Sequence, residues 1–336
     1  MSTTLAISPT IYYCRWGSST VLRPNDDLWK GQRKIMNQAM PPNDTQRFHP
    51  KLLNLTHDLL RALPHSDDVV KTLRTTEEKQ ATGTATPSLT SVALGKMDHK
   101  LDLAKQEELI KTASVTAYAG EQKDPTNGFS GAFILAMLMS PEIQATAHLE
   151  IEQALGPGNL PNFGDEASLP YITAVVRETM RHNPVAPLAV PHELTQDDIY
   201  KGYFLPKGSL IMANVWSILH DEEDYPEPDL FNPSRFLDAD GKIDPEVKDP
   251  TIPAFGFGRR VCPGKHMALA SLWIVVASIL ACYSIEPELD ENGNLIKPKA
   301  KWYSGPTLFN HPLPFKCRFV PRSKDVEVSL ALHLSA

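Results

Sequence analysis

The stretch AFGFGRRVCPGKHMALA, residues 254–270, limits what this chain can fold into more than any other part of it. It holds a single cysteine, Cys262, with the cations Arg259, Arg260 and Lys265 close by and an apolar run directly after it. That run predicts a helix. Nearby positive charge and a helix N-terminus both favour a thiolate. The stretch therefore predicts an activated sulfur at a helix start.

Glycines surround this cysteine, at Gly256, Gly258 and Gly264. They allow a flat ligand to approach the backbone closely, and a thiolate at a helix start suits the axial position of a haem iron. A buried structural cysteine in a turn is the plain alternative. A zinc site using Cys262 and His266 is less favoured, because zinc needs three or four ligands and no other cysteine or histidine is close in sequence.

Length and composition limit the number of domains and the class of protein. The 336 residues, 42% of them apolar, allow one large domain or two ordinary ones, and the net charge of −7 argues against a nucleic-acid binder. Four widely spaced cysteines indicate a reducing compartment: Cys14, Cys262, Cys282 and Cys317. Residues 1–22 contain no long apolar run, so the sequence predicts neither a signal peptide nor a membrane anchor there.

Apolar periodicity predicts a mostly helical chain. A small sheet or hairpin is expected at 188–194 and 199–215, short strands and turns over 284–336, and loops elsewhere, at 64–100, 156–170 and 221–253. The last long helix could cross a membrane by length, but His266 and its small residues favour a core position. Helices are expected at 26–40, 46–63, 101–120, 126–139, 141–155, 169–182 and 265–283.

The cysteine stretch resembles the haem-binding loop of cytochromes P450. The pattern F-x-x-G-x-R-x-C-x-G is met at Phe255, Gly258, Arg260, Cys262 and Gly264. The resemblance implies a mainly α fold with small β-sheets (α+β), haem b as cofactor, Cys262 as the iron ligand and the two glycines as clearance for the porphyrin.

Two further motifs are similar to structural motifs of that family. Glu178 and Arg181 form E-x-x-R on one face of a predicted helix. Arg235, in a segment similar to F-x-P-x-R-F, is the expected third partner. A buried carboxylate and guanidinium are costly without partners. The resemblance implies that these three residues lock the loop that presents the cysteine.

Candidates for holding the haem propionates come from three places. Trp29 and Arg33 form W-x-x-x-R on the first predicted helix, and Arg260 lies in the cysteine loop. His192 follows PLAVP, where many relatives place a cation or donor. Two carboxylates in a closed site need about this number of partners. The alternatives are a core aromatic for Trp29 and a solvated strand residue for His192.

The segment expected to activate oxygen departs from the family pattern. Relatives carry an acid followed by a threonine in a long helix over the haem, where they deliver protons. Here Glu121 follows Ala-Gly, and an acid and a threonine return only at Asp124 and Thr126, around Pro125. Proline inside a helix breaks it, so we expect a break near 120–125, with Asp124 as N-cap and Pro125 at the first helical position. Thr126 and Asp124 are the candidates for proton delivery; the alternatives are that Thr126 is only part of the new N-terminal turn and that Glu121 is the acid.

The resemblance runs from Thr86 to Ser323 and is closest to fungal microsomal enzymes of secondary metabolism. It suggests three parts: an N-terminal segment without an anchor (1–23), one P450-like haem domain with a shortened 64–100 region (24–323) and a tail (324–336). The family lies on the endoplasmic reticulum. Without an anchor, this chain is expected to be cytoplasmic or peripherally membrane-associated.

Two functions are therefore open. The first is a haem-thiolate monooxygenase that inserts one atom of O₂ into a hydrophobic small molecule. Its electrons would come from an NADPH-dependent reductase that docks near Arg259, Lys265 and Lys34. The second is a truncated relative that binds haem weakly or not at all and does not turn over.

Overall fold

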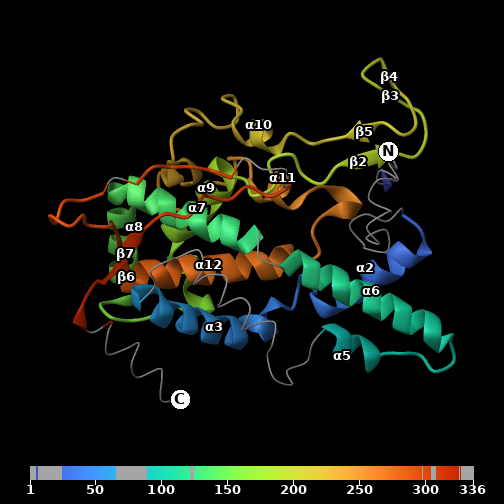
Figure 1. Ribbon diagram of the computed structural model, residues 1–336, viewed down its shortest axis with the longest axis horizontal. Coiled ribbons are helices and arrows are strands. Elements are labelled where there is room, and N and C mark those ends of the chain that lie inside the picture. Colours follow the sequence, from blue (N-terminus) through green and yellow to red (C-terminus); the bar gives the residue numbers. More distant parts are fainter. Residues whose placement is uncertain are drawn as a thin grey trace.

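The computed structural model describes residues 5–6, 25–65, 89–121, 125–296, 298–303, 308–324 and 326. Its described part is mainly helical, with three small antiparallel sheets (Figure 1). The α-helices are α2 Asp27–Ala39, α3 His49–Ala62, α5 Leu89–Leu94, α6 Leu103–Glu121, α7 Pro125–Met139, α8 Pro141–Leu155, α9 Pro170–His182, α10 Val215–Leu219, α11 Thr251–Phe255 and α12 Lys265–Cys282. Short 3-10 turns are η2 Thr45–Phe48, η3 Leu63–His65, η4 Phe163–Ser168, η5 Pro233–Phe236 and η6 Gly258–Arg260.

Helix α12 is the centre of the core. It is apolar around its whole circumference, and from Leu272 to Cys282 every residue is buried except Val275, which is partly buried. Helices α3, α7, α8 and α9 contact it, and Figure 1 shows α12 running between α7 and α3. Among the described helices it alone is long and apolar enough to cross a membrane, but 56% of that window is buried inside the protein. It is a core helix, as the sequence predicted.

The sheets are small and peripheral. Strand β2 (His192–Leu194) lies between β1 (Leu5–Ala6) and β5 (Leu210–Ile211). Strands β3 (Asp198–Tyr200) and β4 (Tyr203–Leu205) form a separate hairpin. Its two turn residues, Lys201 and Gly202, both have positive φ, of 51° and 84°, which is the backbone of a tight hairpin turn. Strands β6 (Tyr283–Pro287) and β7 (Cys317–Pro321) pair near the C-terminal end.

The long predicted helices agree with these bounds, but three short helices were not predicted: α10 and α11, of five residues each, and α5, in the region expected to be a loop at 64–100. Residues 89–94 of it form α5, which packs against α2 and α6. This helix is six residues long, too short for a periodic pattern to show in the sequence, and its tertiary contacts stabilise it. Residues 66–88 lie outside the described part of the chain.

The expected break between two helices is present. Helix α6 ends at Glu121 and α7 begins at Pro125. Proline stands at the first position of α7, where its missing N–H costs nothing. Asp124, the expected N-cap, lies outside the described residues.

Candidate functional site

The cysteine loop is closed by backbone hydrogen bonds. Helix α11 ends at Phe255, and Gly256 turns the chain with a φ of 83°. The Cys262 N–H donates to the Phe255 carbonyl over 2.8 Å, and the Lys265 N–H donates to the Cys262 carbonyl over 3.3 Å. Between them, Gly258–Arg260 form the 3-10 turn η6. The sulfur is thus held directly before the first turn of α12.

The electrostatic surroundings of Cys262 differ from the sequence prediction. Solvent reaches the residue from one side, while protein atoms on the other sides raise the pKa of its thiol by desolvation. Backbone N–H groups of Gly264 and Lys265 and the charge of Arg33 oppose that shift without cancelling it. The sequence attributed a thiolate to the loop cations and to the helix start. The helix-start N–H groups do favour it, but the side-chain charge that does so comes from Arg33 and not from the loop, and burial outweighs both in the protein alone. A bound metal ion would displace the thiol proton.

Helix α2 brings two predicted residues to this loop. The Arg33 guanidinium donates to the carbonyl of Val261, the residue before the cysteine. The Arg260 guanidinium lies over the Trp29 ring, 4.4 Å from its centroid. Asp26 starts the helix by accepting a hydrogen bond of 2.8 Å from the Trp29 N–H. The W-x-x-x-R helix and the cysteine loop, over 220 positions apart in sequence, therefore form one surface.

Three cationic or donor side chains gather on this surface. Burial, followed by repulsion from Arg33, lowers the pKa of Arg260 to about 10, and Asp26 opposes the shift. Burial and the charge of Arg260 likewise lower the pKa of His192, which strand β2 carries. These groups disfavour one another's charge, so an anion placed among them would be stabilised by all three. The donor set fits the two propionates of a haem.

The glycines of the loop also fit a flat ligand. A Cβ added at Gly258 would meet no atom within 4 Å, although its φ of 57° favours glycine. A Cβ at Gly264 would lie 3.9 Å from the Cys262 sulfur and from the Met40 sulfur, an ordinary contact, and its φ of −86° suits any residue. The protein alone therefore does not require glycine at 264. A planar group bound at the sulfur would require glycine at this position, since the group needs the space that a side chain would occupy.

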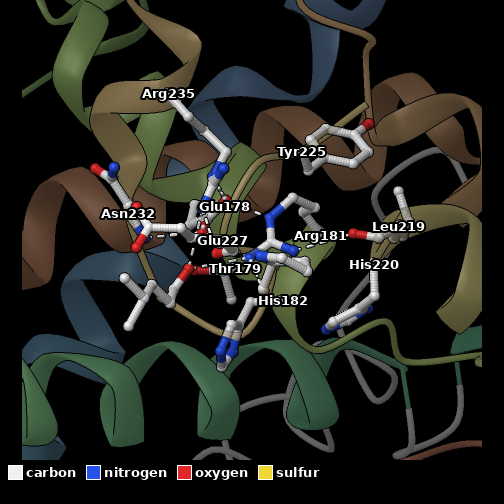
Figure 2. A network of polar contacts seen from close by, with 12 residues as sticks. Glu178, Thr179, Arg181, His182, Leu219, His220, Tyr225, Glu227, Asn232 and Arg235 are labelled. Carbon is white, nitrogen blue, oxygen red and sulfur yellow. Dashed lines mark hydrogen bonds and ion pairs between the residues drawn. The ribbon is translucent and has the colours of Figure 1, made fainter. Parts of the chain in front are cut away.

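The carboxylate of Glu178 and the guanidinium of Arg181 form a fully buried ion pair, both at 0% exposure (Figure 2). Arg181 donates to the two Glu178 oxygens over 2.7 and 2.8 Å. The same guanidinium donates to three backbone carbonyls, those of Leu219, Pro228 and Leu230. Helix α9 is thereby tied to the irregular segment that follows α10.

Arg235 is the third member of this network, as its motif predicted. Its Nε lies 3.3 Å from a Glu178 oxygen, and its other nitrogens donate to the carbonyls of Pro226, Glu227 and Leu230. The Asn232 N–H donates to Glu178 over 2.8 Å. The segment 226–235 therefore wraps around one buried carboxylate, which Figure 2 shows at the centre of the dashed contacts.

Sequence reasoning did not single out Tyr225, which completes the network. The Arg181 guanidinium lies 5.6 Å from the centre of its ring, and its hydroxyl donates to the Lys248 carbonyl over 3.0 Å. Desolvation raises the pKa of this hydroxyl to about 12, so it remains a donor. Its only sequence signal is a lone aromatic in an acidic, proline-rich run, and that pattern is too common to identify a partner.

The region expected to activate oxygen is described only in part. Thr126 is exposed in the first turn of α7, while Asp124 and the side chain of Glu121 lie outside the described residues. Helix α7 packs closely on the C-terminal segment, because a Cβ on Gly128 would lie 2.7 Å from the Asn310 carbonyl oxygen. The Asn310 N–H in turn donates to the Val185 carbonyl over 2.7 Å.

A family model described as Cytochrome P450 matches residues 67–317. The chain belongs to the cytochrome P450 family. It is 43% identical to Cytochrome P450 monooxygenase 98 of Postia placenta over 93% of this chain and 76% of that protein. It is 44% identical to Tryptamine 4-monooxygenase of Psilocybe cyanescens over 74% of this chain and 49% of that protein.

Other relatives match in the same way. Cytochrome P450 monooxygenase claR of Ampulloclitocybe clavipes is 40% identical over 74% of this chain and 45% of its own length, so the chain spans about half the length of several curated relatives. A zebra fish cytochrome P450 structure with abiraterone superposes with a TM-score of 0.73 at 20% identity, covering 96% of this chain and 89% of that one. The fold is therefore the P450 fold.

Proposed function

We propose that this protein is a haem-thiolate monooxygenase. The observation that carries the proposal is the convergence of Cys262 with two cations, Arg33 and Arg260, and the donor His192 at the start of the core helix α12. The reaction would insert one atom of O₂ into a hydrophobic small molecule and reduce the other to water with two electrons and two protons. Fungal relatives named as monooxygenases support this reaction class.

The residues on this surface would have different roles in holding the haem. Cys262 would ligate the iron, and the N–H groups of Gly264 and Lys265 would stabilise negative charge on its sulfur. Arg33, Arg260 and His192 would bind the propionates. When bound, the haem supplies the reductive activation of O₂. Phe255 and Trp29 fix the two sides of the loop, through the Cys262 N–H and the Arg260 guanidinium respectively.

The buried network of Glu178, Arg181 and Arg235 has a structural part. The two arginines hold the segment 226–235 by donating hydrogen bonds to its backbone carbonyls. Helix α9, which carries Glu178 and Arg181, contacts both α11 and α12, the helices that flank the cysteine loop. The network therefore positions the loop without touching the reacting atoms.

Proton delivery on the opposite face of the haem is assigned to Thr126, with Asp124 as the accompanying acid. Thr126 lies in the first turn of α7, directly after the break between α6 and α7, and it is three positions after the place where the family pattern, begun at Ala119, puts its threonine. Its exposure shows that the described protein leaves its hydroxyl accessible.

Electrons would come from an NADPH-dependent flavoprotein reductase. Arg259 and Lys34 are exposed and Lys265 is partly exposed around the cysteine loop and α2, which suits an acidic partner. The substrate class is a hydrophobic fungal metabolite. The names of the relatives, one acting on tryptamine, support small secondary metabolites as a class.

The test is the absorbance spectrum of the reduced, carbon monoxide-bound protein, expressed with a haem precursor. A red-shifted Soret band is expected, and Cys262→Ser should abolish it, whereas the matched variant Cys317→Ser, a partly buried cysteine on β7, should keep it. An unshifted band in the unaltered chain, or no haem, would establish the alternative of an incompetent relative, which the family matches do not favour.

A further inference from the structure

Two histidines lie directly beside the buried network of Glu178 and its arginines, as Figure 2 shows. His182 is the last residue of α9, and His220 is the residue that follows α10. The centroids of their rings are 6.2 Å apart. Both residues are partly buried, so each ring can exchange a proton with solvent while protein atoms surround the rest of it.

His182 completes a set of hydrogen bonds from the end of α9 to three consecutive carbonyls. Arg181 donates to the carbonyls of Pro228 and Leu230. The Nε2 of His182 lies 3.0 Å from the carbonyl between them, that of Asp229. Because a carbonyl can only accept, Nε2 carries the proton of the neutral ring. Two neighbouring side chains of one helix therefore fix this stretch of backbone.

The other nitrogen of the same ring suits a neutral imidazole. The side-chain amide nitrogen of Asn183 donates to the His182 Nδ1 over 2.8 Å. A protonated imidazole is a donor at both nitrogens, so it would turn an N–H toward this amide. The Nδ1 of His220 is also occupied, because it lies 2.8 Å from the Trp216 carbonyl, and the Trp216 ring stacks on it with centroids 4.2 Å apart. The contacts of His182 are complete only in its neutral form.

Charges around the two rings add to this preference. Burial is the largest effect and lowers the pKa of both imidazoles, and Arg181 lowers both further. The bonded carbonyls and the carboxylate of Asp229 oppose the shift at both rings, and Glu178 opposes it at His182, without cancelling it. Helix α10 itself carries no titratable residue. The charged side chains of α9 and of the segment 226–235 near the rings are Glu178, Arg181, Glu227, Asp229 and Arg235.

Protonation would therefore disturb the site without directly breaking the bond to the backbone. The Nε2 of His182 could still donate to Asp229, but the new N–H would meet the Asn183 amide and the new charge would meet buried Arg181. A charged ring in this position gains more from water than from the protein, so it turns toward solvent. The Asp229 carbonyl then loses its donor, and the edge contact with Phe231, 5.7 Å between centroids, is lost as well.

From these contacts we infer that His182 and His220 form an acid-sensitive latch, which holds the segment 226–235 at neutral pH and releases it when the rings take up protons. Helix α9 contacts α11 and α12, which flank the cysteine loop, so the latch acts on the support of that loop. The inference does not depend on haem binding or on catalysis, because every contact in it lies within the protein itself.

The direction of the response follows from the linkage between protonation and opening. In the open form the imidazoles have the ordinary pKa of 6.5, and in the closed form their pKa is lower. The latch is therefore strongest above pH 6.5 and weakens as the pH falls below that value. Between about pH 7.5 and 5.5 the opening equilibrium should rise by at most about tenfold for each histidine.

The test is hydrogen–deuterium exchange of the full chain, measured by mass spectrometry at about pH 7.5, 6.5 and 5.5. Protection factors are used, because they remove the intrinsic pH dependence of exchange. In the segment 226–235 the N–H of Asn232 is bonded to Glu178, so opening exposes it. Protection of this segment should fall by about tenfold on acidification, while the sheet of β6 and β7 remains protected.

Two variants should weaken the acid response by different chemistry. His182→Gln removes the titrating ring, and Asn183→Asp gives a protonated ring a carboxylate at Nδ1. Protection of the segment should depend less on pH in both variants. The matched control is His148→Gln, which removes a histidine on α8 whose pKa burial and Arg322 lower to about 4. This control should keep the acid response of the segment.

Three results would overturn the inference. The first is protection of the segment 226–235 that does not change with pH in the unaltered chain. The second is the same acid response in His182→Gln and Asn183→Asp as in the unaltered chain. The third is an equal loss of protection in the sheet of β6 and β7, because the whole protein would then open rather than this segment.

Discussion

Replacing Glu178 by Gln tests whether one buried carboxylate organises the segment behind the cysteine loop. The substitution keeps the shape and removes the charge. In the structure the carboxylate accepts hydrogen bonds of 2.7 and 2.8 Å from Arg181 and 2.8 Å from the Asn232 N–H, and it lies 3.3 Å from Arg235. Arg181 would keep its charge at 0% exposure with no counter-charge.

The expected cost follows from that burial. Removing one partner of a buried ion pair costs about 3–5 kcal/mol, because the remaining charge stays desolvated. A domain of ordinary stability has about 5–15 kcal/mol in total. Glu178→Gln should therefore lose a large share of the free energy of unfolding, measured as the shift of the urea midpoint at an unchanged slope.

The matched control is Glu286→Gln. It makes the same chemical change in an ion pair of 2.6 Å with Arg318, where both side chains are about 40% exposed. An exposed pair contributes about 0–1 kcal/mol, so the control should unfold nearly as the unaltered chain does. Equal midpoints for the two variants would refute the reasoning, since burial would then have no energetic consequence at this site.

A double variant separates charge from hydrogen bonding. In Glu178→Met with Arg181→Met both of these charges are gone, but the carbonyls of Leu219 and Pro228 lose the Arg181 donor, while that of Leu230 keeps Arg235, which in turn loses its counter-charge. An unsatisfied buried acceptor costs about 1–3 kcal/mol. We expect the double variant to remain clearly destabilised. Recovery of the original stability would show that Arg181 serves only to neutralise Glu178.

Three further predictions concern other parts of the chain. Gly128→Ala should destabilise the protein by about 1–3 kcal/mol in urea unfolding, because its Cβ would meet the Asn310 carbonyl oxygen at 2.7 Å. Gly31→Ala is the control and should destabilise it less, because its Cβ would meet only a flexible leucine side chain. A larger loss of stability for Gly31→Ala than for Gly128→Ala would contradict the close packing of α7. Burial and the charge of Arg322 lower the pKa of His148 to about 4, so on acidification the unfolded chain takes up the proton first and the free energy of unfolding should decrease as the pH falls from about 6.5 to 4. His148→Gln should make the free energy of unfolding depend less on pH in this range, and an unchanged dependence would show that His148 is not the titrating group. Thr126→Ala should raise the peroxide released per NADPH consumed if its hydroxyl delivers protons, and unchanged coupling would exclude it.

Much of the candidate site could be predicted from sequence because the motifs are local. The loop around Cys262 and the helix face shared by Glu178 and Arg181 each depend on residues fewer than twelve positions apart, so spacing alone brings them together. The same holds for the break at Pro125, where the chemistry of proline determines the outcome without tertiary contacts.

The charge state of Cys262 could not be predicted in this way. Its sequence neighbours are cations, but the side-chain charge that acts on the sulfur comes from Arg33, over 220 positions away. Desolvation depends on how the whole chain packs around the sulfur, and it outweighs both that charge and the helix N–H groups. The sequence indicated the contribution of the helix start but not that of burial, because burial is not visible in a local pattern.

By itself, the sequence determined the type of each long helix, the cysteine loop and the resemblance to the P450 family, because these follow from periodicity, proline and glycine positions and short motifs. Only the tertiary structure decided that α5 is a helix, that Trp29 meets Arg260, and that Ile199 and Phe204 remain exposed on the hairpin. Each of these depends on which distant surfaces come into contact, and contact decides where charge is desolvated and where apolar surface is left in water.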